Sequence, residues 1–184
     1  TAQDAAPPTA VELAAHEPPY AQLLRRKWRP EGSHSVGNTL TGRLYGGSQL
    51  PATGEGYEVF EECLERDTQW GTPDLVELLQ HAARTVKAAA PGPPMMVCNM
   101  SQKGGGNISW SRSHNSGRDA DIAFFVRSKG EMWKAPGLVP FNRDGLSFWD
   151  AGITFDTARN WQLMRALITH PTVHVQWIFV YDPL

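Results

Sequence analysis

The clearest helical pattern in the chain follows residue 72. Apolar side chains recur there every three or four residues, at Leu75, Leu79, Ala82, Ala83 and Val86. Thr72 is a favourable N-cap residue, and Pro73 suits the first helical position because no N–H is needed there. The spacing therefore predicts a helix that starts after Thr72 and ends before Pro91 and Gly92, with His81 as a surface residue rather than a ligand.

A second helix and three strands complete the regular elements that the pattern predicts. The helix has Asp156 as its N-cap and ends before Pro171. Its pattern predicts four buried side chains, Trp161, Met164, Leu167 and Ile168. Apolar runs predict strands at 95–100, 120–126 and 173–180. The chain has 17 Gly and 14 Pro, and seven of the glycines fall between residues 32 and 56. We therefore expect an α+β fold with a small antiparallel sheet flanked by helices and long Gly/Pro-rich loops.

Composition and charge narrow the domain organisation and the partners. The Ala- and Pro-rich residues 1–19 predict an arm, and residues 20–184 predict one domain. Lys and Arg total 17 against 19 Asp and Glu, a formal net charge of −2. This near-balance argues against a general polyanion binder, and the cations within 25–29 suit the solvated face of a short helix, so we expect no nucleic-acid partner. No apolar run approaches the roughly 18 residues of a membrane span.

The two cysteines, Cys63 and Cys98, are too few for a disulfide scaffold and lack the Cys-x-x-Cys spacing of zinc and redox sites. One disulfide and two buried thiols are equally compatible with the sequence. Cysteine or serine hydrolysis is disfavoured, because Cys98 lies in a predicted buried strand and no Gly-x-Ser-x-Gly elbow is present.

The residues that are candidates for catalysis or metal binding lie between positions 111 and 125. His114 lies in a loop of Ser, Asn and Gly, and seven residues later Asp121 enters an otherwise apolar predicted strand. A carboxylate at the mouth of a buried strand must be compensated, because an unpaired buried charge costs several kcal/mol. Arg118 could supply the positive charge, or a metal ion could, with His114 as a second ligand.

Read as a string, residues 113–122 resemble the Ser-His-x-x-Gly-x-x-x-Asp-Ile zinc motif of the penicillin-insensitive murein endopeptidases. That family belongs with the lysostaphin-like and D-Ala-D-Ala metallopeptidases and the hedgehog signalling domain. Further blocks resemble the family in its own order, at 35–37, 42–44, 50–51, 54–57, 70–76, 155–161 and 177–180. The resemblance thus runs from about Ser35 to the last residue and implies the hedgehog and D-Ala-D-Ala peptidase type of fold.

The resemblance implies a periplasmic or secreted zinc hydrolase that cuts peptide cross-links of bacterial peptidoglycan between D-alanine and diaminopimelate. His114 and Asp121 would be two of its three zinc ligands. Such a centre keeps one open position, lowers the pKa of bound water to about 7 and polarises the scissile carbonyl. Arg66 could stabilise an oxyanion or a substrate carboxylate, or be an exposed arginine at a helix end.

One feature of the family is absent from the sequence. Its members carry a His-x-His pair, the source of the third ligand and the general base, beyond the Ile-Phe-Val strand, and this chain ends at Leu184 without one. His170 and His174 precede that strand, and Pro171 keeps them off a common helix face. A nicked enzyme with a bound C-terminal fragment, a shortened chain, and a degenerate member remain open. The last would be a non-catalytic module that binds peptidoglycan or protein.

Overall fold

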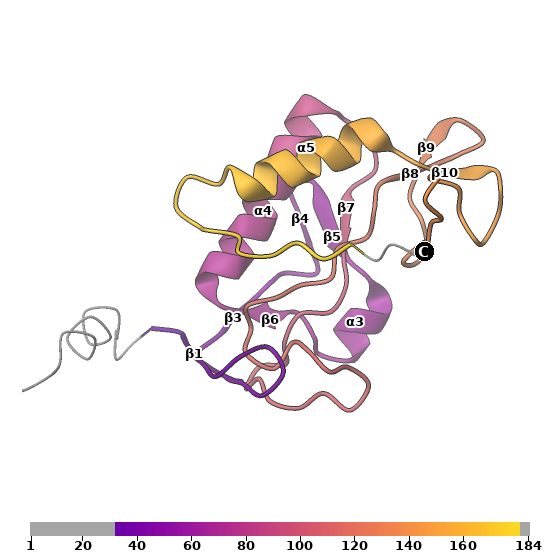
Figure 1. Ribbon diagram of the computed structural model, residues 1–184. Coiled ribbons are helices and arrows are strands. Elements are labelled where there is room, and N and C mark those ends of the chain that lie inside the picture. The colour runs from indigo at the N-terminus through magenta and orange to yellow at the C-terminus, as the bar shows by residue number, and fades with distance from the viewer. Residues whose placement is uncertain (1–31, 181–184) are drawn as a thin grey trace, which may run out of the picture. The chain divides into compact units, whose positions relative to one another are not determined.

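The computed structural model describes residues 32–180 (Figure 1). The predicted arm over residues 1–19 and the short helix near residues 23–29 lie outside the described residues. Over residues 32–180, no helix is long and apolar enough to cross a membrane.

Short strands and three helices alternate along the described chain. The strands are β1 (His34–Val36), β2 (Arg43–Tyr45), β3 (Ser48–Gln49), β4 (Thr53–Gly54), β5 (Tyr57–Val59), β6 (Trp70–Gly71), β7 (Met95–Val97), β8 (Val126–Ser128), β9 (Glu131–Trp133) and β10 (Ile153–Phe155). The helices are α3 (Glu61–Glu65), α4 (Pro73–Ala89) and α5 (Thr157–Ile168). This mixed architecture confirms the α+β prediction.

Four small sheets take the place of the single sheet that we expected. Among the described residues they are β1-β2, β3-β6, β4-β5-β7 and β10-β8-β9. All their strand pairs are antiparallel except β5 with β7, which is parallel. Gly and Pro residues lie close to the ends of these strands and limit each to two or three residues. No strand within residues 32–180 is therefore long enough to pair with strands of two different sheets.

Helix α4 forms where the sequence predicts it. The hydroxyl of Thr72 accepts a hydrogen bond from the backbone N–H of Leu75 at 3.3 Å, and Pro73 occupies the first turn. The apolar face of α4 packs against α5 and the β4-β5-β7 sheet (Figure 1). Its buried residues are Val76, Leu78, Leu79, Ala82, Ala83 and Val86. The predicted helix is therefore confirmed, and it forms the centre of the main core.

Helix α5 begins as predicted but buries a different face. The carboxylate of Asp156 caps it by accepting from the backbone N–H of Arg159 at 3.1 Å. Trp161 is 60% exposed and Ile168 is 58% exposed, so the prediction that both are buried is wrong. The buried face includes Asn160, whose side-chain amide pairs with the backbone of Phe125, the residue before β8. Its oxygen accepts from the Phe125 N–H at 3.0 Å, and its nitrogen donates to the Phe125 carbonyl at 2.7 Å. A pattern of apolar residues cannot detect a face on which buried polar side chains are fully paired.

The predicted strands are shorter than the apolar runs. Strand β7 covers only the first half of 95–100, and β8 starts at the last residue of 120–126. The segment around Asp121 is extended and bonded to the end of β7, through Cys98 N–H to Asp121 O and Asp121 N–H to Asn99 O, both at 2.8 Å. This connection places Asp121 beside the core without a continuous strand.

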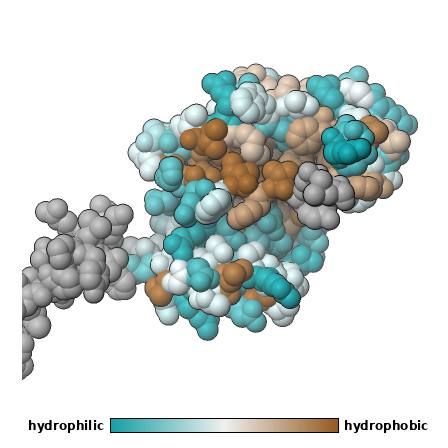
Figure 2. Space-filling view, in the orientation of Figure 1, coloured by the Kyte–Doolittle hydropathy of each residue, from teal (hydrophilic) through white to brown (hydrophobic). Residues whose placement is uncertain are grey.

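The segment 173–180 is not a strand in the structure. No strand among the described residues pairs with it, and Trp177 and Phe179 are 70% and 88% exposed. Figure 2 shows hydrophobic side chains gathered on the face that this segment crosses. The third predicted strand is therefore wrong for the described chain, because an apolar sequence cannot form a ladder without a hydrogen-bonding neighbour.

Candidate metal centre

His114 lies in a loop that hydrogen bonds tie to distant parts of the chain. The N–H of Asn115, a buried residue, donates to the carbonyl of Thr39 at 3.0 Å. The carbonyl of Gly117 accepts from the N–H of Thr72, the N-cap residue of α4, at 2.8 Å. The loop is therefore fixed both to the Gly-rich segment before β2 and to the start of α4.

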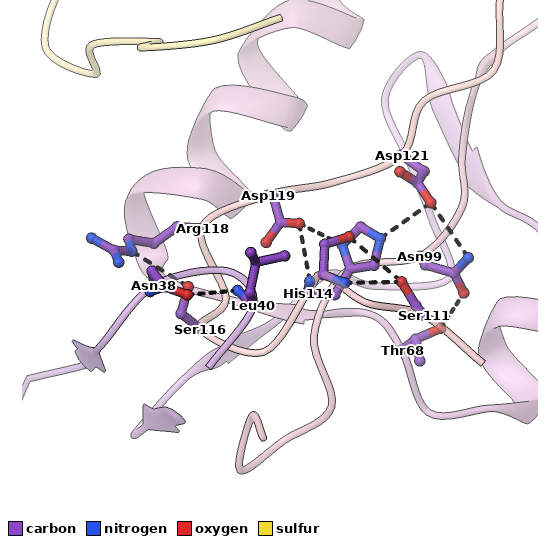
Figure 3. Close-up of polar contacts among 11 residues, drawn as sticks. Asn38, Leu40, Thr68, Asn99, Ser111, His114, Ser116, Arg118, Asp119 and Asp121 are labelled. Carbon is purple, nitrogen blue, oxygen red and sulfur yellow. Dashed lines mark hydrogen bonds and ion pairs between the residues drawn. The ribbon is translucent and has the colours of Figure 1, made fainter. Parts of the chain in front are cut away.

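Two carboxylates hold the imidazole of His114 from opposite sides (Figure 3). The backbone of His114 has a φ of 69°, in the left-handed region that few residues other than glycine adopt. Asp119 stabilises this conformation, because its Oδ2 accepts from the N–H of His114 at 3.1 Å and lies 2.9 Å from Nδ1. The other ring nitrogen, Nε2, lies 3.2 Å from Oδ2 of Asp121. Nδ1 thus faces Asp119, and Nε2 faces Asp121 and becomes a potential metal ligand once its proton is lost.

The two groups differ in their access to solvent. The side chain of His114 is 4% exposed, whereas that of Asp121 is 45% exposed. Asn99 supports Asp121 from the core side, with its amide nitrogen 3.5 Å from Asp121 Oδ2. The hydroxyl of the fully buried Thr68 in turn donates to Asn99 Oδ1 at 3.2 Å. The site thus combines a buried imidazole with a supported carboxylate that solutes can reach.

The carboxylates change the proton affinity of the site. Burial alone lowers the pKa of His114, but hydrogen bonds and charge from Asp119 and Asp121 outweigh burial and raise this pKa to about 10. Burial raises the pKa of Asp121, but the hydrogen bond and charge of His114, with the bond from Asn99, leave it below its ordinary value. The site therefore favours a positive charge between the ring of His114 and the carboxylates of Asp119 and Asp121.

Arg118 does not supply the charge that compensates Asp121. Its guanidinium donates to the carbonyl of Gly37 and to the hydroxyl of Ser116. It therefore braces the loop that carries His114, while His114 itself is the partner of Asp121.

Arg66 lies at the end of α3, and the sequence left its role open. Its guanidinium is 3.3 Å from the carboxylate of Glu62 and lies over the ring of Trp110, 5.5 Å from the ring centroid. The side chain is 40% exposed. These contacts hold Arg66 to the loop before His114, and its chemical role stays a prediction.

The remaining histidines of the sequence analysis lie elsewhere. The side chain of His170 is buried against His81, with Nε2 2.8 Å from Glu77, and His174 is exposed. His81 is half-buried rather than a free surface residue. Within residues 32–180, the groups of three ligand-type side chains close enough to share an ion are Glu77, His81 and His170, and Glu62, Cys63 and Cys98. Neither group contains His114 or Asp121.

Sequence reasoning missed Asp119 and Asn99. Asp119 lies inside the motif, two residues before Asp121. The sequence carries one signal for its role, because a second acidic residue follows Gly117 in a loop too tight for both acidic side chains to face solvent. Asn99 is separated from Asp121 by 22 residues, and only the pairing of 96–99 with 121–123 brings the two together.

The donor set fits a zinc ion. Two ligand atoms about 2.0 to 2.1 Å from a tetrahedral zinc lie about 3.3 Å apart. Nε2 of His114 and Oδ2 of Asp121 are 3.2 Å apart. An imidazole whose other nitrogen faces a carboxylate is the common arrangement of a zinc-ligating histidine.

The protein is thus a small α+β fold that brings a histidine and two carboxylates together in one site. The chain belongs to the penicillin-insensitive murein endopeptidase family, whose sequence profile matches residues 35–143. It is 35% identical over 111 residues to the penicillin-insensitive murein endopeptidase of Haemophilus influenzae, covering 60% of this chain and 36% of that protein. It is 28% identical over 138 residues to that of Escherichia coli O1:K1, covering 71% of this chain and 48% of the relative. The matched region thus spans between about a third and a half of these relatives.

The site loop makes a specific prediction about Gly117. Its φ is 68°, and an added Cβ would lie 2.7 Å from a methyl carbon of the buried Leu44. Gly117→Ala should lower the free energy of unfolding by about 2 to 5 kcal/mol in urea denaturation, from left-handed strain and overpacking together. Gly130→Ala is the control, since its φ is 86° and nothing lies within 4 Å of the added Cβ. It should lose about 1 to 2 kcal/mol from strain alone, and equal losses in the two variants would contradict the packing described for the loop.

Proposed function

We propose that this chain is the zinc-binding part of an exported endopeptidase that hydrolyses D-alanyl-diaminopimelyl cross-links in peptidoglycan. The observation that carries the proposal is the 3.2 Å approach of His114 Nε2 to Asp121 Oδ2, with Asp119 behind the ring. Family membership supports murein as the substrate and supports a periplasmic or extracellular location.

The chain's own residues prepare the site for the metal. Zinc, when bound, lowers the pKa of a coordinated water to about 7 and polarises the scissile carbonyl. Asp119 faces Nδ1 of His114 and would keep a proton there, so that Nε2 is the nitrogen that gives up its proton and becomes the ligand. Asp121 contributes a negative charge, and Asn99 fixes the orientation of its carboxylate. The burial of His114 keeps water from competing for its ring nitrogen.

The third zinc ligand and the general base belong, in this proposal, to a C-terminal fragment of the same protein that carries a His-x-His pair. A catalytic zinc has three protein ligands and one open position, and the proposal assigns two ligands among residues 32–180, His114 and Asp121. The exposed aromatic side chains of Trp177 and Phe179 offer such a fragment an apolar surface.

Arg66 is proposed to bind a carboxylate of the cross-linked peptide or the oxyanion of the reaction. Its guanidinium is partly exposed and is held between Glu62 and the ring of Trp110, so little side-chain freedom is lost on binding.

A second candidate function is a non-catalytic module that binds peptidoglycan or protein. The observation that favours it is that the proposal finds only two zinc ligands, His114 and Asp121, among residues 32–180. A site with two protein ligands and no general base would bind zinc weakly and would not promote hydrolysis.

The zinc proposal predicts the metal content of single variants. His114→Ala and Asp121→Ala should each lose bound zinc, measured by elemental mass spectrometry after dialysis, while far-UV circular dichroism stays close to that of the parent protein. His174→Ala is the control, because His174 is exposed and should be dispensable for zinc binding. Normal zinc content in either His114→Ala or Asp121→Ala would remove the site assignment.

The catalytic proposal predicts hydrolysis of purified cross-linked muropeptide dimers. The chain together with the proposed C-terminal fragment should release monomers, detected by chromatography, whereas the chain alone should not. A chelator should abolish release, and added zinc should restore it. Binding of the dimers without release, with the fragment present, would contradict the catalytic proposal and favour the binding module.

A further inference from the structure

Two sulfur atoms meet in the core behind the candidate metal centre. Cys63 on α3 and Cys98 just after β7 are 0% and 1% exposed, and their sulfurs lie 2.8 Å apart as free thiols. They are the only two cysteines of the chain. The approach is much closer than that of two non-bonded sulfur atoms, and less than an ångström longer than an S–S bond of about 2.05 Å.

We propose that Cys63 and Cys98 form a disulfide in the native protein, and that this bond fixes the backbone that supports Asp121. The chemical class of the modification is oxidation by a disulfide donor, either a small-molecule disulfide or a disulfide oxidoreductase. The formation of the bond stands by itself, whereas its effect on Asp121 rests on the proposed function.

The backbone brings the sulfurs together before any bond forms. The N–H of Phe60 donates to the carbonyl of Val97 at 3.0 Å, which ties the start of α3 to the end of β7. The carbonyl of Cys63 accepts from the N–H of Thr68 at 3.0 Å, and the N–H of Cys98 donates to Asp121 at 2.8 Å. Both cysteines are thus held in place by hydrogen bonds on their own main chain.

The bond forms by thiol–disulfide exchange with the donor. During folding, before the core encloses it, the thiolate of Cys98 attacks one sulfur of the donor disulfide and expels the other as a thiolate. Cys63, after losing its proton, then attacks the Cys98 sulfur and releases the second donor thiol. The two cysteines lose two protons and two electrons, and the donor is reduced to two thiols.

The proposed bond connects to the metal site through two residues. Asn99 follows Cys98 directly, and its amide lies 3.5 Å from the carboxylate of Asp121. The hydroxyl of Thr68 lies 3.1 Å from the Cys63 carbonyl and 3.2 Å from Asn99 Oδ1. A covalent link between Cys63 and Cys98 would therefore fix the two groups that position Asn99, namely its chain neighbour Cys98 and the Thr68 hydroxyl. Through Asn99 it would fix the carboxylate of Asp121. In this account Cys63, Cys98, Thr68 and Asn99 are positioning residues.

A metal ion shared by Cys63, Cys98 and Glu62 is the competing explanation. Two thiolates on one tetrahedral zinc lie about 3.8 Å apart, which is longer than the 2.8 Å between these sulfurs. The carboxylate of Glu62 is about half exposed and paired with Arg66 at 3.3 Å. The sulfur separation and the pairing of Glu62 both favour the disulfide.

Thiol counting on the full chain tests the bond without reference to zinc or activity. The protein is unfolded, refolded in a glutathione buffer rich in the oxidised form so that both thiols meet the oxidant, then denatured in iodoacetamide and measured by intact mass spectrometry. We expect a monomer lighter by two hydrogen atoms with no alkyl adduct, and two adducts after reduction. Cys63→Ala and Cys98→Ala are controls that should show that each remaining cysteine can be alkylated once unpaired. Two adducts in the oxidising buffer, a disulfide-linked dimer, or alkylation that begins only after a chelator removes bound zinc would each overturn the disulfide.

Two further measurements test what the bond does. The oxidised protein should melt roughly 5 to 15 °C above the reduced protein, as expected for closing a loop of this length. Its zinc dissociation constant should be on the order of tenfold lower than that of the reduced protein, as for other groups that orient metal ligands. Asn99→Ala should remove this difference in zinc affinity while the difference in melting temperature stays. Equal zinc affinity in the two redox states would overturn the link to Asp121. A disulfide in a protein that binds no zinc would leave the bond standing and contradict the proposed function.

Discussion

The structure depends on how an almost fully buried imidazole is held between two carboxylates. Burying His114 beside the partly exposed carboxylates of Asp119 and Asp121 is costly unless a positive charge lies among the three groups. A proton satisfies this requirement in the ion-free protein, which is why the pKa of His114 rises to about 10. In the proposed function, a divalent cation would satisfy the same requirement by binding the same atoms in place of the proton.

The rest of the fold keeps these three side chains in place without a large sheet. The N-cap residue of α4, Thr72, bonds the site loop at Gly117, and the end of β7 bonds the segment of Asp121. Helices α4 and α5 bury the core from which these anchors emerge.

The sequence predicted what depends on local chemistry. Thr72 and Asp156 cap the two long helices as expected, since N-caps act within three residues of themselves. The motif also identified His114 and Asp121, which the structure brings together. Trp161 was assigned to the core because no local signal shows that Asn160, beside it, is buried and paired with Phe125. The contact of Asn99 with Asp121 depends on the pairing of chain segments far apart in the sequence, which no local pattern shows. The segment 173–180 has no such pairing partner among the described residues, so the strand predicted there does not form.

Diffraction from a zinc-soaked crystal at the zinc absorption edge tests the central claim most directly, because it locates the ion without assuming any activity. The account predicts an anomalous peak between Nε2 of His114 and Oδ2 of Asp121, at about 2.0 to 2.2 Å from each atom. Peaks at the Glu77, His81 and His170 group or at the Glu62, Cys63 and Cys98 group, with none beside His114, would contradict it.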